Sequence, residues 1–395
     1  QLEQHLGGKL EDSTIAPSRH SMLRPNILLR CLWTLLTAFV IVLVIRNTRP
    51  TCEVSVQTKE LKELVRHNYT LHSEERSFPL AFSILAYRDL HRVLRLLNTI
   101  HRPHNCYCIH IDRKATHQFR AIIEQTVHKR YGMEVFVVPE AESLDVRWGL
   151  MSVLDADLMC SRILLNRCSD WKYWINLTGQ EFPLRTNWEL VTALKLLNGS
   201  NMIAGSFKHR INSRLPLRVR LNFTFTWFKG SVHIAARREF VQFVHTDIKA
   251  KQILQVLREH ERKVSKVTVP DETYFATINH NPVSLPVPGA FLRDTTNRDL
   301  KQISRYKVWA SSHLPCGSGR WVRSICMLGL NDLPRLIDQP EFFANKFVPE
   351  VEPEAYDILE LWLAHKVDYE TRHAQLHPSF KRAYYSSLES SWRHL

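Results

Sequence analysis

The stretch Asp170-Trp-Lys-Tyr-Trp-Ile-Asn-Leu-Thr-Gly-Gln-Glu-Phe-Pro-Leu184 determines how we interpret the rest of the chain. Its residues 173–177 are mostly aromatic or β-branched, a composition typical of a buried strand. Thr178-Gly179 ends this strand, and Gln180-Glu181 places polar groups at its carboxyl end. Ligands of parallel α/β sheets bind outside the carboxyl ends of the strands, so we expect a site at residues 179–181.

Strand and helix patterns alternate on both sides of this stretch. Apolar runs at 80–86, 106–111 and 134–138 predict further strands, and apolar residues at helical spacing follow at 90–100, 119–127 and 148–165. Thr186-x-x-Glu189 is a capping box, which begins a helix through Leu197. The alternation predicts an α/β fold with a parallel sheet and right-handed connections.

The second half of the chain is less regular. Lys, Arg and Phe recur in residues 205–229, and residues 230–236 are patterned as a strand. Residues 254–264 are typical of a charged, exposed helix, and another helix is expected to begin near Thr273. The polar residues from His373 onward are expected to fray.

One apolar segment, residues 27–45, has the length of a membrane-spanning helix at ~1.5 Å per residue. A cleaved signal peptide is the alternative, but Arg46-Asn-Thr-Arg49 lacks the small-residue cleavage pattern. We therefore expect a single-pass type II anchor. The domains would be a cytosolic tail at 1–26, the anchor at 27–45, a stem at 46–78, a lumenal α/β domain at 79–372 and a C-terminal tail at 373–395.

Sequons and cysteines agree with an oxidising compartment. The N-glycosylation pattern occurs at Asn68, Asn176, Asn198 and Asn222. Asn176 lies in the predicted central strand, so we expect it to be unmodified and the other three to be the glycosylation sites. None of the eight cysteines forms a CxxC pair or has a His partner at zinc spacing, so across a membrane they predict disulfides.

The formal net charge of +14 favours an anionic partner, such as nucleic acid, a membrane surface or a phosphorylated small molecule. No long Lys/Arg run and no interleaved basic and aromatic groove motif occurs, so nucleic acid is the least favoured. The sequence also has no Gly-rich phosphate loop, no Asp-x-Asp at the end of a strand, and no HExxH or G-x-S-x-G motif. These absences favour a site without a metal ion.

Glu272 is the first candidate for a catalytic group. Pro-Asp precedes it, so its carboxylate is expected in the first turn of a helix with a rigid entry. Partial burial there would raise its pKa and suit a general base. The alternative is a carboxylate that only caps a helix and interacts with its dipole.

Four further residues are candidates for ligand contacts. Asp112 ends a predicted strand, where it either contacts a ribose or base or forms a turn. Arg323 and Lys346 are isolated cations among aromatic or apolar residues, and each either faces an anion such as a diphosphate or extends to the surface. Trp309 either stacks on a sugar ring or belongs to the core.

Several of these segments together resemble glycosyltransferase family 14, and most closely its core 2 and I-branching β-1,6-N-acetylglucosaminyltransferases. The resemblance runs from about Pro79 to His365. It implies a GT-A fold, a Rossmann-like mixed sheet flanked by helices, in a type II Golgi membrane enzyme. It also implies inverting transfer from a UDP-sugar without a divalent metal or other cofactor. The matching segments are Ser83-Ile-Leu-Ala86, Tyr107 to Ala115, Asp157-Leu-Met-Cys160, Trp171 to Leu177, Gly179-x-x-Phe-Pro183, Pro270-Asp-Glu272, Val322 to Cys326 and Phe343 to Phe347.

The resemblance also implies roles for single residues. Glu272 matches the base that takes the proton from the C6 hydroxyl of the acceptor, and Arg323 and Lys346 match two cations that neutralise the departing UDP. The remaining matches are Ala86, Tyr87 and Asp112 at the uridine moiety, Trp309 against the acceptor, and two disulfides, Cys108–Cys160 and Cys316–Cys326.

The chain departs from the family pattern mainly on the acceptor side. Residues 200–220 are shorter than in core 2 enzymes and contain no recognisable acidic acceptor-binding position, and Ser311 replaces a tyrosine. Cys52 lacks its usual partner, because no cysteine follows Cys326, and would pair between two chains in a disulfide-linked dimer. Cys106 and Cys168 could pair with each other.

These observations predict a β-1,6-glycosyltransferase that transfers N-acetylglucosamine, or alternatively glucose, from a UDP-sugar to an O-glycan or glycoprotein. One alternative is an inactive, membrane-anchored relative that binds a glycan or a UDP-sugar. Another is a xylosyltransferase-type enzyme acting on serine. A protein that only binds has no need of a base and a leaving-group clamp, so Glu272 with Arg323 and Lys346 argues for catalysis.

Overall fold

The computed structural model describes residues 71–292 and 302–395. The predicted anchor, most of the stem, Asn68 and Cys52 lie outside these residues. Within the described ranges, no helix is both long and apolar enough to cross a membrane.

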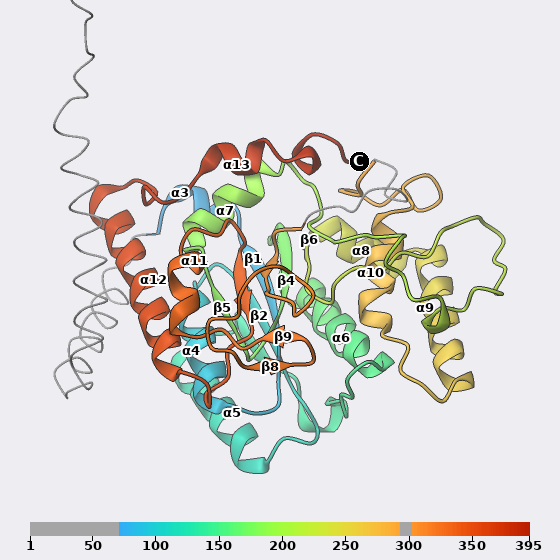
Figure 1. Ribbon diagram of the computed structural model, residues 1–395, viewed down its shortest axis with the longest axis horizontal. Helices are drawn as coiled ribbons and strands as arrows, with labels where there is room; N and C mark the ends of the chain where they lie inside the picture. Colours follow the sequence, from blue (N-terminus) through green and yellow to red (C-terminus); the bar gives the residue numbers. More distant parts are fainter. Residues whose placement is uncertain (1–70, 293–301) are drawn as a thin grey trace, which may run out of the picture. The chain divides into compact units, whose positions relative to one another are not determined.

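Strands and helices alternate in the first half, whereas the strands of the second half have only two or three residues each and are separated by loops and by the long helices α9 and α12 (Figure 1). The strands are β1 (Leu80–Ala86), β2 (Cys106–Ile111), β3 (Val135–Val137), β4 (Tyr173–Thr178), β5 (Glu181–Pro183), β6 (Ala235–Arg237), β7 (Arg305–Tyr306), β8 (Trp321–Val322), β9 (Ile325–Cys326) and β10 (Phe343–Asn345). The helices are α3 (Ser73–Arg76), α4 (Leu90–Ile100), α5 (His117–Arg130), α6 (Met151–Arg167), α7 (Asn187–Leu196), α8 (Arg238–Thr246), α9 (Ile248–Lys263), α10 (Tyr274–Asn279), α11 (Leu333–Leu336), α12 (Pro353–His373) and α13 (Arg382–Ser386).

The main sheet has the strand order β3-β2-β1-β4-β6. The first four strands are parallel, and β6 is antiparallel to β4. The predicted strands at 80–86 and 106–111 are confirmed, and β4 begins at Tyr173 as expected. The mixed, mainly parallel sheet is consistent with the predicted GT-A-like fold.

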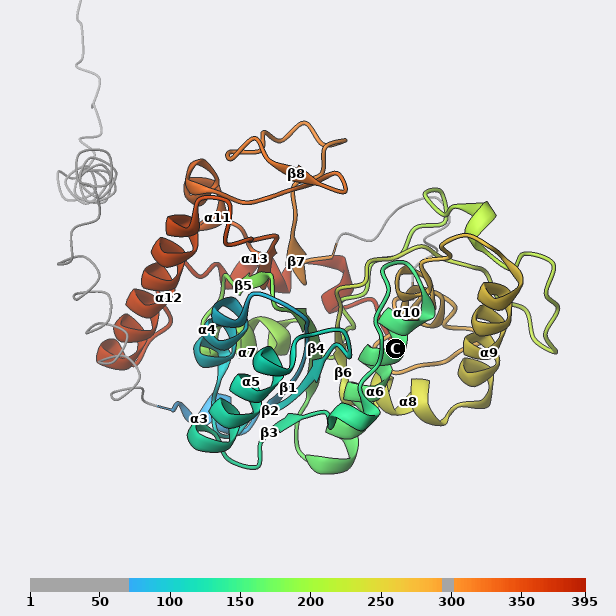
Figure 2. The ribbon, with the colours of Figure 1, turned by 90° about the horizontal axis from the view of Figure 1, so that it is seen from below.

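Both faces of this sheet are buried, because successive side chains of a strand point to opposite sides. In β1, Leu80, Phe82 and Ile84 join a core with α4, α5 and α7, whereas Ala81 packs in a second core with α6, α8 and α9. Figure 2 shows α4 and α5 on one side of the sheet and α6 and α8 on the other. Burying each large apolar side chain contributes about 1.5–3 kcal/mol, so these two faces hold the sheet together.

A second sheet brings distant segments next to the carboxyl end of β4. Its strand order is β5-β10-β7, with β10 antiparallel to β5 and parallel to β7. The Phe347 N–H donates to the carbonyl of Gln180 at 2.9 Å. The ring of Phe182 packs edge-on against Tyr356 of α12, with centroids 4.6 Å apart. Residue 346 therefore follows a strand that pairs with β5, and residue 307 follows β7, the next strand of the same sheet.

The capping box on α7 is present, since the Thr186 side chain accepts from the Glu189 N–H and the Glu189 carboxylate accepts from the Thr186 N–H. Two expectations for the second half need correction. The strand expected at 230–236 occupies only Ala235–Arg237, and α9 begins at Ile248 rather than at 254. Asp247 explains the earlier start, because its carboxylate caps α9 by accepting the Ala250 N–H at 2.9 Å.

The prediction that the chain frays after His373 is wrong. The hydroxyl of Tyr385, which is buried, donates to the Pro340 carbonyl at 2.8 Å. At the end of the chain, the Leu395 N–H donates to Ala290 and the Leu395 carbonyl accepts from Gly289, both at 2.9 Å. Side-chain burial and backbone pairing thus hold a segment that its polar composition alone suggested was loose.

The cysteines pair differently from the family pattern. Cys316–Cys326 is bonded, and so is Cys106–Cys168, the pair that the sequence left open. The expected Cys108–Cys160 bond is not formed. Both residues are buried free thiols, and the Cys160 thiol donates to the Cys108 carbonyl at 3.7 Å. Burial raises the pKa of the Cys160 thiol well above its ordinary value, which keeps it protonated and unreactive.

Candidate active site

The ends of β1 and β2 bring together the residues predicted to contact uridine. The Asp112 N–H donates to the Ala86 carbonyl at 2.8 Å, so the residue after β2 lies beside the last residue of β1. Tyr87 follows Ala86 and is half exposed, with the Arg88 guanidinium 5.4 Å from its ring centre. The three predicted residues therefore share one edge of the sheet.

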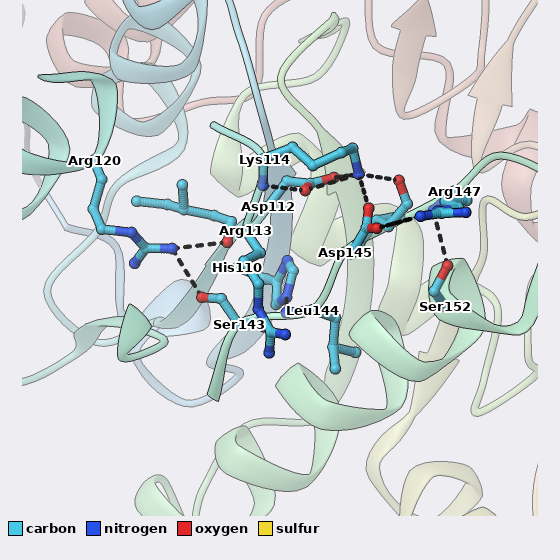
Figure 3. A network of polar contacts seen from close by, with 12 residues as sticks. His110, Asp112, Arg113, Lys114, Arg120, Ser143, Leu144, Asp145, Arg147 and Ser152 are labelled. Carbon is cyan, nitrogen blue, oxygen red and sulfur yellow. Dashed lines mark hydrogen bonds and ion pairs between the residues drawn. The ribbon is translucent and has the colours of Figure 1, made fainter. Parts of the chain in front are cut away.

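The carboxylate of Asp112 belongs to a network of paired charges (Figure 3). Lys114 donates to it through its backbone N–H at 2.8 Å and through Nζ at 3.0 and 3.1 Å. Lys114 Nζ also forms an ion pair with Asp145, and Arg147 donates to Asp145 at 2.9 and 3.1 Å. The acids and bases of this network compensate one another, and they tie residues 145–147 to the end of β2.

Glu181, at the carboxyl end of β4, is fully buried and held by residues far away in sequence. Arg305 Nε donates to its carboxylate at 2.6 Å, and His233 Nε2 lies 2.6 Å from its other oxygen. Burial alone would raise the pKa of Glu181, but Arg305 and His233 outweigh it and lower the pKa to about 2. Burial lowers the pKa of His233 to about 3, so the imidazole is neutral and the ion pair is Glu181–Arg305. Glu181 therefore holds Arg305 and His233 together beneath the candidate site, and its own carboxylate is not accessible to a ligand.

Several cations lie around the buried Glu181–Arg305 pair. Within residues 71–292 and 302–395, Lys307, Lys346 and Arg323 form no ion pair with a carboxylate. Burial, with the positive charges of Arg323 and Arg88, lowers the pKa of Lys346. Burial is also the main cause that lowers the pKa of Lys307 to about 8. Cations that repel one another in this way are stabilised by a bound anion.

Arg323 lies in the turn between β8 and β9, with a positive φ of 50°. Its guanidinium stacks over the ring of Trp148, 4.4 Å from the centroid. The next residue, Gly149, accepts backbone N–H groups from Thr268 at 3.2 Å and Val269 at 2.9 Å. Through this segment, the β8–β9 turn is connected to the turn that carries Glu272.

Glu272 ends a 3-10 helix, Pro270–Glu272, directly before α10, so it stands at a helix entry after Pro-Asp, although the first turn is 3-10 and not α-helical. Its carbonyl accepts the Gly230 N–H at 2.6 Å, which fixes the backbone. Its carboxylate is partly exposed, and Oε2 lies 3.4 Å from Lys229 Nζ. The backbone is thus rigidly held while the carboxylate can reach a ligand.

The acid before it, Asp271, has a different environment. It is buried, and burial together with the neighbouring Glu272 carboxylate raises the pKa of Asp271 to about 7. Two adjacent carboxylates therefore differ in exposure, and only Glu272 faces solvent.

Trp309 is 41% exposed, and Lys307 Nζ lies 5.7 Å from its ring centre. The residue also bridges to Ile325 of β9, which places the tryptophan beside the hairpin that carries Arg323. An exposed indole next to the cations offers a flat surface to a sugar ring.

The sequence missed Lys307, Lys229 and the Glu181–Arg305 pair. A signal for Lys307 was present, because residues 305, 307 and 309 alternate along an extended segment and share a face. Of the predicted glycosylation sites, Asn198 and Asn222 are exposed. Asn176 is buried, and its amide donates to Asp157 at 2.8 Å and to Val232 at 2.7 Å. In the part of the chain that the structure describes, no cluster of three His, Cys, Asp or Glu side chains could hold a metal ion.

A partly exposed carboxylate, a group of cations and an exposed tryptophan thus belong to one α/β domain with a mixed sheet. Comparison with known proteins identifies the family of this domain. Residues 80–337 match the family model "Branch: Core-2/I-Branching enzyme", and the chain belongs to this family of glycosyltransferases.

Named relatives cover most of the chain. It is 32% identical over 335 residues to a Danio rerio protein named β-1,3-galactosyl-O-glycosyl-glycoprotein β-1,6-N-acetylglucosaminyltransferase 4, covering 78% of this chain and 75% of that one. It is 29% identical over 331 residues to the human enzyme 3 of the same name, covering 77% and 72%. It is 31% identical over 321 residues to human N-acetyllactosaminide β-1,6-N-acetylglucosaminyl-transferase, covering 75% and 76%.

Proposed function

We propose that this protein transfers a sugar from a UDP-sugar to the C6 hydroxyl of an O-glycan, forming a β-1,6 branch with inversion at the anomeric carbon. N-acetylglucosamine is the favoured sugar because the similar enzymes are named for it, and glucose is the alternative. The observation that carries the proposal is that one cation, Lys307, interacts electrostatically with both Glu272 and Lys346. A candidate base and a candidate phosphate-binding group thus belong to one site.

In the proposed reaction, Glu272 takes the proton of the acceptor hydroxyl as its oxygen bonds to the anomeric carbon. The bond between that carbon and the β-phosphate oxygen breaks, and its electron pair leaves with UDP. Lys346 and Arg323 neutralise the charge that develops on the leaving group, a role worth about 3–4 kcal/mol for each well-placed donor. Asp112, with Ala86 and Tyr87, would bind the uridine moiety, and Trp309 would stack on the acceptor.

We further propose that the reaction needs no divalent metal and no other cofactor. Lys346, Arg323 and Lys307 provide positive charge at the place where a metal ion would otherwise compensate the diphosphate. The described residues contain no acidic cluster opposite these cations.

The proposed setting is the Golgi lumen, with the chain held by a single-pass type II anchor at residues 27–45. The two disulfides of the described domain fit an oxidising compartment. Asn68, Asn198 and Asn222 would be glycosylated, and Cys52 would link two chains. Treatment with an N-glycosidase and non-reducing electrophoresis test these last two points.

The base is tested by Glu272→Gln. This change should lower kcat on the order of 10³-fold, the scale of general-base catalysis, while UDP affinity measured by calorimetry stays within about twofold. Glu239→Gln, which alters an exposed carboxylate paired with Arg237 at 2.8 Å, is the matched control and should keep full activity. Normal turnover by Glu272→Gln would refute the assignment.

A further inference from the structure

A pocket opens next to Glu272, on the side of the irregular segment before β6. Its polar lining comes mainly from Arg210, Arg214, Lys229 and Glu272, and its apolar lining includes Phe228 and Leu215. We call it the basic pocket. None of the proposed donor residues Asp112, Arg323 and Lys346 lines it.

The charge of this pocket is unbalanced. Residues 190–238 contain nine Lys and Arg and no Asp or Glu. Glu272 is the only carboxylate on the lining, and its partner is Lys229. Among the described residues, Arg210 and Arg214 form no ion pair. Within the described residues, two guanidinium groups of the lining therefore have no carboxylate paired with them.

Arg210 is positioned by neutral neighbours. Its guanidinium lies over the ring of Phe207, 3.6 Å from the centroid, and Nε donates to the Asn212 side chain at 3.0 Å. These contacts orient the guanidinium and leave its terminal N–H groups for another acceptor.

The neighbouring helix α9 and the residues after it place two lysines and one acid, Glu261, close to the pocket. His260 contacts the backbone of Arg214, and Lys263 and Lys266 lie near it. Of the acids of this helix, Glu259 accepts from Gln255 at 2.8 Å. Glu261 accepts from the Met151 N–H at 2.8 Å and from the hydroxyl of Thr268, a residue of the pocket lining, at 3.1 Å. The surroundings increase the positive potential of the basic pocket.

We propose that the basic pocket binds an anionic substituent of the acceptor glycan, a carboxylate or a sulfate, through Arg210 and Arg214. Guanidinium groups bind such planar or multi-oxygen anions through paired hydrogen bonds. The pocket borders the candidate base, so an acceptor held there by its charged group would present a hydroxyl to Glu272. This inference rests on the proposed function, because it names the class of acceptor for the same site.

The test compares kcat/KM for three acceptors with the full chain: galactose-β-1,3-N-acetylgalactosamine, the same disaccharide with sialic acid on the galactose, and the same disaccharide with sulfate there. At low salt, we expect at least one charged acceptor to exceed the neutral one about tenfold, the factor that one good charge-assisted contact provides. The sialylated and sulfated acceptors separate a carboxylate from a sulfate as the ligand. Equal or lower kcat/KM for both charged acceptors would overturn the proposal.

Variants of the pocket arginines test whether the preference for charged acceptors depends on the basic pocket. Arg210→Gln with Arg214→Gln should lower the ratio of charged to neutral acceptor about tenfold. Arg218→Gln with Arg220→Gln is the matched control, because these exposed residues of the same segment do not line the pocket, and it should leave the ratio unchanged. An unchanged ratio in the first double variant would contradict a role of these arginines.

A binding measurement separates this inference from the proposed function. If none of the three acceptors receives a sugar, saturation-transfer NMR with the same disaccharides still tests the pocket. Binding of a charged disaccharide that Arg210→Gln with Arg214→Gln abolishes would support the basic pocket while the transfer proposal fails. No preference for a charged over the neutral disaccharide would overturn the basic pocket.

Discussion

Two charged regions of the candidate site differ in how their charges are balanced. Around Asp112, acids and bases alternate, and Lys114 pairs with Asp112 and Asp145. Around Glu272, the nearby cations outnumber the carboxylates, and among the described residues Lys307 and Arg210 form no ion pair within contact distance of a carboxylate. Balanced charges can hold a loop without a ligand, whereas cations gathered without a counter-charge favour an anion. The difference indicates where the phosphates and the acceptor would bind.

The largest expected effect concerns a buried ion pair, Glu181–Arg305. Glu181→Ala should lower the free energy of unfolding by about 3–5 kcal/mol, because it leaves Arg305 buried without its counter-charge. Lys114→Ala is the matched control, since it breaks a pair whose lysine is half exposed and should cost less than about 1 kcal/mol. Denaturant unfolding of both variants measures the difference. Similar losses would show that burial does not distinguish the Glu181–Arg305 pair from the Lys114–Asp112 pair.

The next prediction concerns Lys346 and Arg323, the cations of the proposed diphosphate site. Lys346→Ala and Arg323→Ala should each weaken UDP binding about 10- to 100-fold, because each removes a positive charge from the proposed diphosphate site. Lys195→Ala, which removes a surface cation paired with Glu74 at 2.8 Å, is the control for net charge. Calorimetric titration with UDP gives the affinities. Unchanged affinity in both site variants would make these cations structural.

A smaller effect appears in the pH dependence of stability. Burial raises the pKa of Asp157 from its ordinary 3.8 to about 7, although Asn176 and Ser83 donate hydrogen bonds to it. The folded protein therefore binds a proton that the unfolded chain has released, and the free energy of unfolding should fall as pH rises from about 4 to 7. Asp157→Asn should reduce this slope by up to ~1.4 kcal/mol per pH unit, the value for one proton.

The same unfolding curves, recorded at several pH values, check the Asp157 prediction. Glu124→Gln, which alters a carboxylate whose side chain is 45% exposed, serves as the control and should keep the slope of the unmodified protein. If Asp157→Asn also kept that slope, the carboxyl group would not be the proton-binding group in this range.

The sequence predicted the regular half of the fold because local patterns determine it. β1 and β2 have their predicted bounds, since continuous apolar runs mark strands that are buried on both faces. The candidate residue Asp112 was found for the same reason, as it stands at the end of such a strand, whereas Ala86 was named only because of the family resemblance.

The remainder of the site depends on contacts between distant segments, which no local pattern encodes. Arg305 reaches Glu181 across 124 residues, so neither residue reveals its partner in the sequence. The turn at Pro270–Glu272 forms because Val269 adopts a left-handed conformation with φ of 51°, which is unusual for a β-branched residue. The sequence predicted a helix entry at Glu272 but not the strained residue that precedes it.

The most direct test of the central claim is a transfer assay in excess EDTA. The full chain would be incubated with UDP-N-acetylglucosamine or UDP-glucose and a galactose-β-1,3-N-acetylgalactosamine acceptor, neutral or sialylated, and the mass and linkage of the product determined. The account predicts a β-1,6-linked product from at least one donor with full activity in EDTA. Activity that disappears in EDTA and returns with manganese, or a product with another linkage, would contradict it.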